Sequence, residues 1–196
     1  MIPTNEIKFA DTVMLIDAIY VDRVVTALSA HFSKVLNREL PAADLSILLE
    51  CMAMDTQVKP KNGVVQALFI YDKSLTSFTH LQPADLKKEL NDVAFKSELG
   101  EFQLNTYEPQ DMADRETFFL ESLKLIVDAK EVKHLVVAPS EEEYASKLPE
   151  ILKQVDGKEY MGVLGMNPPA DKVPFEWGML GYAVLRALGI RSEELN

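Results

Sequence analysis

Apolar residues along this chain follow two spacings, short unbroken runs and helical repeats. Residues 12–17 form an apolar run that ends on Asp17, which is typical of a strand covered on both faces in a parallel sheet. From Val21 onward the apolar residues recur every three or four positions, which predicts an amphipathic helix over residues 21–36. The two spacings alternate through most of the sequence. We therefore expect an α/β fold with a mostly parallel central sheet.

The remaining elements are predicted from the same spacings. The predicted strands cover residues 64–72, 101–107, 133–138 and 159–166. The predicted helices cover residues 41–52, 118–127, 141–155 and 175–188, with Gly189 as the cap of the last one. A turn is expected at residues 61–63, a short helix at residues 82–86, and a hairpin in which residues 76–81 pair back on the strand before them. Residues 133–166 form a β-α-β unit, whose two strands should run parallel.

The composition narrows the protein class. The chain has 196 residues, of which 47% are hydrophobic, enough for one well-buried core. We expect a single three-layer α/β/α domain over residues 1–196. The net charge of −11 argues against broad, non-specific attraction to nucleic acid or anionic lipid. Cys51 is the only cysteine, so an intramolecular disulfide and a thiolate zinc site are both excluded.

The N-terminal sequence does not resemble a targeting signal. It carries acidic residues where a signal peptide needs basic ones, and Asp17 and Asp22 interrupt the apolar segment that follows. No uncharged apolar window approaches the roughly 18 residues that a membrane-spanning helix needs. The sequence therefore predicts a soluble, cytoplasmic protein without membrane association.

Acidic side chains follow several predicted strands. Asp17 and Asp72 end two of them, Glu108 follows a third, and residues 140–143 and Asn167 follow the strands of the β-α-β unit. Ligands of open α/β sheets bind beyond the carboxyl ends of the strands, so these groups are expected near one edge. Carboxylates that converge there can hold Mg²⁺ or Mn²⁺ and activate a water for phosphodiester hydrolysis.

The same acids also have structural explanations. Ser140 and Glu143 have the spacing of a helix capping box, and Glu141 and Glu142 would stabilise the positive end of a helix dipole. Asp17 is harder to explain in this way, because it closes a buried strand and the three residues after it offer only one phenol. Both a structural and a functional role therefore stay open for Asp17.

Several sequence motifs of well-known enzymes are absent. No G-x-G-x-x-G follows the first strand, and no G-x-x-x-x-G-K-[ST] or G-x-S-x-G occurs, which excludes the usual dinucleotide, P-loop and hydrolase-elbow sites. Trp177 stands near the start of the last predicted helix, where packing is the favoured role.

Two resemblances add to this interpretation. From residues 11–18 to residues 187–191, the chain resembles an uncharacterised family of bacterial conserved hypothetical proteins. More distantly, it is similar to the NYN branch of the PIN-like nucleases. Those domains open with a hydrophobic strand ending in aspartate, here residues 13–17, and later carry the motif V-S-G-D-x-D-F, here residues 138–144. Residues 148–165 also resemble the helix, turn and strand that follow that motif.

The distant resemblance implies a PIN-like topology and a magnesium- or manganese-dependent ribonuclease. Asp17, Glu141 and Glu143 would hold the metal, helped by Glu116 or Glu121 on the preceding helix. The sequence departs from the motif, since glutamates replace both late aspartates and Ser140 replaces the glycine. The longer side chains shift both carboxylates outward, and small cations demand near-ideal geometry.

Three functional hypotheses follow. The first is a degenerate NYN/PIN-like domain with a binding or regulatory role, with a protein or RNA partner. The second is a Mg²⁺- or Mn²⁺-dependent ribonuclease or phosphodiesterase, which requires Asp17, Glu141 and Glu116 or Glu121 to converge. The third is a small-molecule binder or enzyme on a flavodoxin-like sheet, which requires an apolar pocket with few titrating groups.

Overall fold

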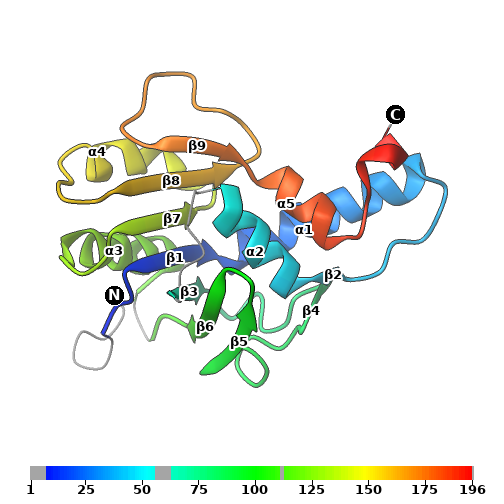
Figure 1. Cartoon of the computed structure of the whole chain (residues 1–196), viewed down its shortest axis with the longest axis horizontal. Helices are drawn as coiled ribbons and strands as arrows, with labels where there is room; N and C mark the ends of the chain where they lie inside the picture. The colour runs from blue at the N-terminus through cyan, green and yellow to red at the C-terminus, as the bar shows by residue number, and fades with distance from the viewer. Residues whose placement is uncertain (1–7, 56–62, 111–112, 196) are drawn as a thin grey trace.

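The chain folds into a seven-stranded sheet with helices on both faces, a three-layer α/β/α architecture (Figure 1). The computed structural model describes residues 8–55, 63–110 and 113–195. The fold class predicted from the alternating apolar spacings is thereby confirmed.

The sheet has the spatial order β5-β6-β3-β1-β7-β8-β9, and only β5 runs antiparallel to its neighbour. Its strands are β1 (Thr12–Asp17), β3 (Val64–Ile70), β5 (Val93–Ser97), β6 (Gly100–Tyr107), β7 (His134–Ala138), β8 (Tyr160–Gly165) and β9 (Glu176–Met179). Numbered along the chain, the six parallel strands have the order 3-2-1-4-5-6. This is one of the two common doubly wound orders, and it differs from the other, the flavodoxin-like order 2-1-3-4-5.

The central strand β1 divides two hydrophobic cores. Met14 and Ile16 point into one core, and Val13 and Leu15 point into the other, because successive side chains of a strand face opposite sides. The first core is covered by α1 (Ala18–Val35), α2 (Leu45–Asp55) and α5 (Leu180–Ala187), and the second by α3 (Arg115–Asp128) and α4 (Leu148–Leu152). The strand is therefore buried on both faces, as its unbroken apolar run predicts.

The connections that leave β1 and β7 diverge to opposite faces of the sheet. After β1 the chain enters α1 on one face, and after β7 it reaches α4 on the other. The point between these two neighbouring strands is the topological switch point, where open α/β sheets form a crevice for ligands. Asp17 and the segment after β7 both lie at this point.

The predicted helix over residues 141–155 is largely absent. Turns cover residues 141–144, a 3-10 helix covers Ala145–Lys147, and only Leu148–Leu152 is α-helical. Pro149 explains the break, because its ring clashes with the carbonyl four residues earlier and it has no N–H to donate. Proline is tolerated in the first turn of a helix, which is where α4 places it.

The predicted helix over residues 175–188 divides into a strand and a shorter helix. Residues 176–179 form β9 at the edge of the sheet, parallel to β8, and α5 begins at Leu180. Gly178 lies so close to β8 that an added Cβ would be 2.7 Å from the Leu164 side chain. Gly189 follows the last turn with a φ of +70°, which confirms its predicted capping role.

The middle of the chain differs most from the prediction. Residues 76–81 do not return along β3, and Leu81–Gln82 (β4) instead pairs in parallel with Ala43–Asp44 (β2) in a separate two-stranded sheet. Residues 83–86 form no helix, and the exposed strand β5 was not predicted. Lys61 and Asn62 of the predicted turn lie outside the described residues. The last element is a 3-10 helix, η2 (Ser192–Leu195).

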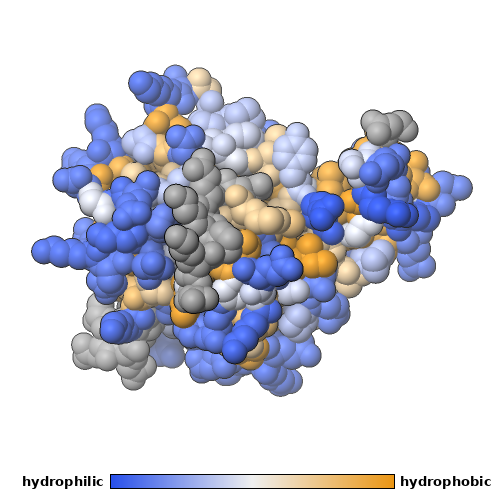
Figure 2. All heavy atoms as spheres, in the orientation of Figure 1, coloured by the Kyte–Doolittle hydropathy of each residue, from blue (hydrophilic) through white to orange (hydrophobic). Residues whose placement is uncertain are grey.

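The face of the molecule seen in Figure 2 is largely hydrophilic, with apolar atoms gathered over α2 and α5. Those helices carry the exposed side chains of Ile47, Met54 and Tyr182. Within residues 8–55, 63–110 and 113–195, no helix is long and apolar enough to cross a membrane.

Two glycines with positive φ have different surroundings, and the difference can be tested by substitution. Gly100 starts β6 with a φ of +134°, and an added Cβ would be 2.2 Å from the Gly63 carbonyl oxygen. Gly157 has a φ of +75° and open space around it. Gly157→Ala should lower the free energy of unfolding by about 1 kcal/mol, from backbone strain alone. Gly100→Ala should lower it by at least about 2 kcal/mol more, because the clash with backbone adds to the strain.

Urea denaturation of the two variants and the wild type measures this difference. Equal losses of stability for Gly100→Ala and Gly157→Ala would contradict the close approach of Gly100 to Gly63.

Candidate functional site

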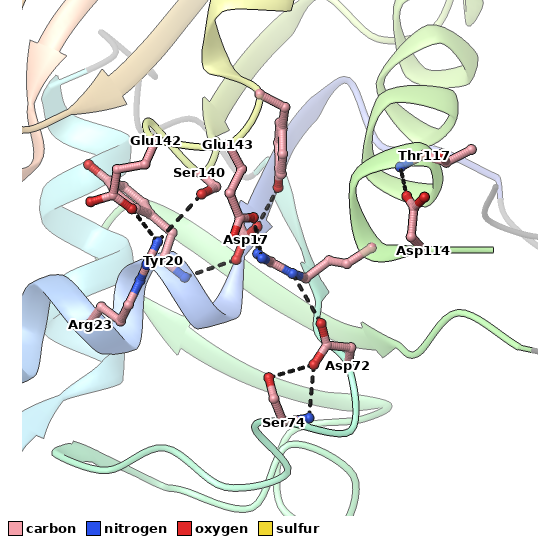
Figure 3. Close-up of polar contacts among 12 residues, drawn as sticks. Asp17, Tyr20, Arg23, Asp72, Ser74, Asp114, Thr117, Ser140, Glu142 and Glu143 are labelled. Atoms are coloured by element: carbon pink, nitrogen blue, oxygen red, sulfur yellow. Dashed lines mark hydrogen bonds and ion pairs between the residues drawn. The ribbon is translucent and has the colours of Figure 1, made fainter. Parts of the chain in front are cut away.

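A single arginine occupies the centre of the acidic cluster at the switch point. The guanidinium of Arg115 contacts the carboxylates of Asp17 and Glu143, and its Nε lies 3.2 Å from Asp72 Oδ2. Figure 3 shows these three acids converging from the ends of β1 and β3 and from the segment after β7. This guanidinium brings together three of the acids that the sequence places near this edge, Asp17, Asp72 and Glu143.

Asp17 is the most buried member of the cluster, with no exposed surface. Its Oδ1 accepts a hydrogen bond from the backbone N–H of Tyr20 at 2.9 Å, so the side chain caps α1. Its Oδ2 accepts hydrogen bonds from Arg115 and from the buried hydroxyl of Tyr144. The carboxylate thereby connects the first strand, its helix, α3 and the segment after β7.

The electrostatics of the cluster favour a permanent cation at Arg115. Burial opposes the charge of the guanidinium, but the surrounding carboxylates outweigh that effect and raise the pKa of Arg115. Partial burial favours a higher pKa for Asp72, but the hydrogen bonds from Ser74 and the charge of Arg115 hold that pKa below its ordinary value. The cluster therefore contains one fixed positive charge among three acids.

The two buried acidic groups around Arg115 both have a raised pKa. Burial raises the pKa of the Asp17 carboxyl, against the opposing effects of Arg115 and of the hydrogen bonds from Tyr144 and Tyr20. Burial and the neighbouring Asp17 also raise the pKa of the Tyr144 phenol. Tyr144 therefore keeps its proton and acts as a hydrogen-bond donor to Asp17.

Arg115 and Tyr144 were missed in the sequence. Arg115 is the first residue of α3, directly after the N-cap Asp114, whose side chain accepts from the Thr117 N–H at 2.6 Å. A cation at this end of a helix is unfavourable, because the helix dipole is positive there. That misplaced charge was the one sequence feature that could have revealed Arg115.

The predicted capping box of residues 140–143 is wrong. Ser140 Oγ accepts from Arg23 at 3.5 Å, and the Glu143 carboxylate contacts Arg115. Glu142 forms an exposed ion pair with Arg23 at 2.5 Å. These side chains join the segment to α1 and α3 and cap no helix.

Glu141 lies beside the cluster but belongs to a different set of contacts. Its Oε1 accepts from the backbone N–H groups of Met166 and Asn167 at 2.9 and 2.8 Å, and its Oε2 accepts from the Tyr20 hydroxyl at 2.7 Å. Gly165 makes this approach possible, because an added Cβ would be 2.3 Å from Glu141 Oε1. Glu141 therefore holds the end of β8.

The two acids predicted on the helix before β7, Glu116 and Glu121, both lie in α3, and Glu116 directly follows Arg115. Glu116 forms an ion pair with Lys147, and Glu121 lies further along the helix. Among the described residues, no group of three or more His, Cys, Asp or Glu side chains is arranged to hold a metal ion. The metal-ligand roles of Asp17, Glu116, Glu121, Glu141 and Glu143 stay predictions.

A pocket of about 470 Å³ opens beside Glu141, at the carboxyl ends of β7 and β8. It lies under the connector formed by residues 167–175 and against β9. Apolar and aromatic side chains form most of its wall, among them Pro139, Pro149, Val163, Val173, Phe175 and Trp177. Its polar groups include Glu141, Glu142, Ser146, Asn167 and Asp171.

Comparison with known proteins identifies a family. Residues 6–195 match DUF6621, a family of unknown function. The chain belongs to this family. No match was found among curated proteins, and none among solved structures.

Membership in DUF6621 confirms the predicted relationship to an uncharacterised family over nearly the whole chain. It brings no activity with it, and none of the comparisons supports the resemblance to NYN or PIN-like nucleases. The properties of this DUF6621 chain must therefore be argued from its own residues.

The ion pair between Asp17 and Arg115 should dominate the stability of the site. Asp17→Asn and Arg115→Met should each lower the free energy of unfolding by about 3–5 kcal/mol, because each leaves a buried partner without its counter-charge. The double variant should lose less than the sum of the two, because neither charge is then left unpaired. Urea denaturation of all four proteins gives the coupling energy.

Arg23→Met is the matched control for this cycle. It removes an arginine from an ion pair whose side chains are 48% and 69% exposed. Such exposed pairs contribute about 1 kcal/mol at most. Additive effects of Asp17→Asn and Arg115→Met, or losses no larger than that of the control, would exclude the proposed role of the pair.

Proposed function

We propose that this DUF6621 protein is a binding protein for a small organic ligand, which it holds in the pocket beside Glu141. The observation that carries the proposal is the position of the pocket. It lies beyond the carboxyl ends of two parallel strands, where ligands of doubly wound sheets bind, and its volume of about 470 Å³ falls in the range of small-molecule sites.

The lining of the pocket indicates the chemistry of the ligand. Glu141, Glu142 and Asp171 are its acidic groups, and no Lys, Arg or His is found among its described lining residues. Glu142 is paired with Arg23, so Glu141 and Asp171 supply the uncompensated negative charge. A negatively charged ligand would meet repulsion there, whereas an amine would meet carboxylates. The half-buried rings of Phe175 and Trp177 offer apolar surface and π-faces that attract cations. We therefore infer an apolar ligand that carries an ammonium or amidinium group.

The Arg115 cluster supports a binding role over metal-dependent hydrolysis. A nuclease centre uses such acids to hold a metal ion, whereas here a guanidinium lies among Asp17, Asp72 and Glu143. The position that a cation would fill is occupied by the protein itself. A distant relationship to NYN or PIN-like domains is part of this proposal, with Asp17 and Glu143 kept and the metal replaced by Arg115.

The proposal is tested with aromatic compounds that carry an amidinium or ammonium group. Trp177 is the only tryptophan of the chain and lines the pocket, so its fluorescence reports directly on occupancy. Benzamidine and phenethylamine should quench or shift this fluorescence saturably, whereas benzamide and benzoate, which lack the positive charge, should bind at least about tenfold more weakly. Calorimetric titration of the same compounds checks the stoichiometry.

Two variants test whether the ligand binds in this pocket. Phe175→Ala should weaken benzamidine binding by removing part of the aromatic wall. Tyr182→Ala removes an aromatic side chain that is 69% exposed on α5 and should leave binding unchanged. Saturation that is equally tight for benzoate, or that is indifferent to Phe175→Ala, would rule out the proposed site.

The role of Arg115 as an internal cation predicts the outcome of a manganese titration. Calorimetry on the wild type should show no saturable Mn²⁺ binding, because Asp17 and Glu143 already contact the guanidinium. Asp17→Asn is the comparison. Saturable Mn²⁺ binding by the wild type that Asp17→Asn abolishes would favour the ribonuclease or phosphodiesterase alternative.

A further inference from the structure

A second cavity lies at the other half of the same sheet edge. It has a volume of about 390 Å³ and opens at the carboxyl ends of β3 and β6, beyond Tyr71 and Thr106. It shares no lining residue with the pocket beside Glu141. Its chemistry is also opposite, because two lysines, Lys73 and Lys87, line it and Glu108 is the only acid among its described lining residues.

The two lysines carry charge that is free to bind a ligand. Within the part of the chain that the structure describes, no carboxylate lies within ion-pairing distance of Lys73 or Lys87. Lys73 and Lys87 thus line one cavity without a carboxylate partner among the described residues, in a protein whose net charge is −11. Such a pair creates a local positive potential that attracts an anion.

Both lysines extend from backbone that is already fixed. Lys73 follows Asp72, whose carboxylate is held by Arg115 and by the Ser74 N–H at 2.8 Å. Lys87 follows Leu86, whose carbonyl accepts from Thr106 Oγ1 at 2.9 Å. A ligand would have to order only the side chains, which lowers the entropic cost of binding.

Hydrogen bonds also hold the polar wall of the cavity in place. Asn91 Oδ1 accepts from the Thr106 N–H at 3.0 Å, which ties the loop after Lys87 to β6. Burial and the charges of Glu108 and Asp85 raise the pKa of Tyr71, so its phenol stays protonated. The wall therefore adds neutral polar groups to the two positive charges.

We propose that this cavity binds a small phosphate monoester that carries hydroxyl groups. Two ammonium groups from separate loops act as point charges, which is how lysines bind the distributed charge of a phosphate group. Glu108 then accepts hydrogen bonds from the ligand's hydroxyl groups. The site is independent of the amine-binding pocket of the proposed function.

The probes for this site are ribose 5-phosphate, inorganic phosphate and ribose, titrated by calorimetry into the wild type at low ionic strength. Ribose 5-phosphate should bind most tightly and ribose most weakly. Lys73→Met and Lys87→Met should each weaken the binding of ribose 5-phosphate by about tenfold, the effect of losing one charged hydrogen bond. Added salt should weaken it further through screening.

Lys124→Met is the matched control. It removes the same charge from an exposed position of α3, away from the lining of this cavity, and should leave binding unchanged. The proposal is overturned by an absence of binding to the wild type, or by losses as large for Lys124→Met as for Lys73→Met. Equal affinities for inorganic phosphate and ribose 5-phosphate would overturn the role of Glu108. None of these outcomes depends on amine binding beside Glu141.

Discussion

The structure depends on one buried ionic interaction, the contact of Arg115 with Asp17 at the switch point of the sheet. Removing charges from water costs several kcal/mol per ion, so a buried carboxylate persists only where charge and hydrogen bonds compensate it. For Asp17, Arg115 supplies the opposite charge, and the Tyr144 hydroxyl and the Tyr20 N–H donate hydrogen bonds. Because these partners come from three different segments, the same interaction that compensates the charge also fixes the carboxyl edge of the sheet.

Much of the fold was predictable from apolar spacing, because the buried parallel strands leave unbroken runs in the sequence. β1, β3, β7 and β8 were placed within two residues of their observed ends, and the three-layer architecture followed from them. The prediction failed where a local interaction outweighed the spacing. Pro149 shortened the helix after β7, and pairing with β8 drew residues 176–179 into a strand. Exposed β5 is too short to show a period, because its three apolar residues are consecutive and two polar residues follow them.

The site was predictable only in part. The convergence of Asp17 and Glu143 follows from topology, because the carboxyl ends of neighbouring parallel strands meet at one edge. The arginine between these two acids does not follow from topology, because Arg115 reaches the cluster from α3, about a hundred residues from Asp17. Glu141 differs from Glu143 for an equally local reason, because Gly165 leaves room for its carboxylate against the backbone of β8. No spacing rule anticipates either contact.

The connector of residues 167–175 has a consequence for how this family can diversify. Because β8 and β9 run parallel, the connector must return from the carboxyl end of β8 to the start of β9 (Figure 1). On the way it forms one wall of the pocket beside Glu141. It contributes little to either hydrophobic core. Changes in the length or sequence of this loop should therefore reshape the pocket at little cost to folding, whereas changes in the Arg115 cluster should lower stability. The shape of this pocket and the stability of the fold therefore depend on different residues.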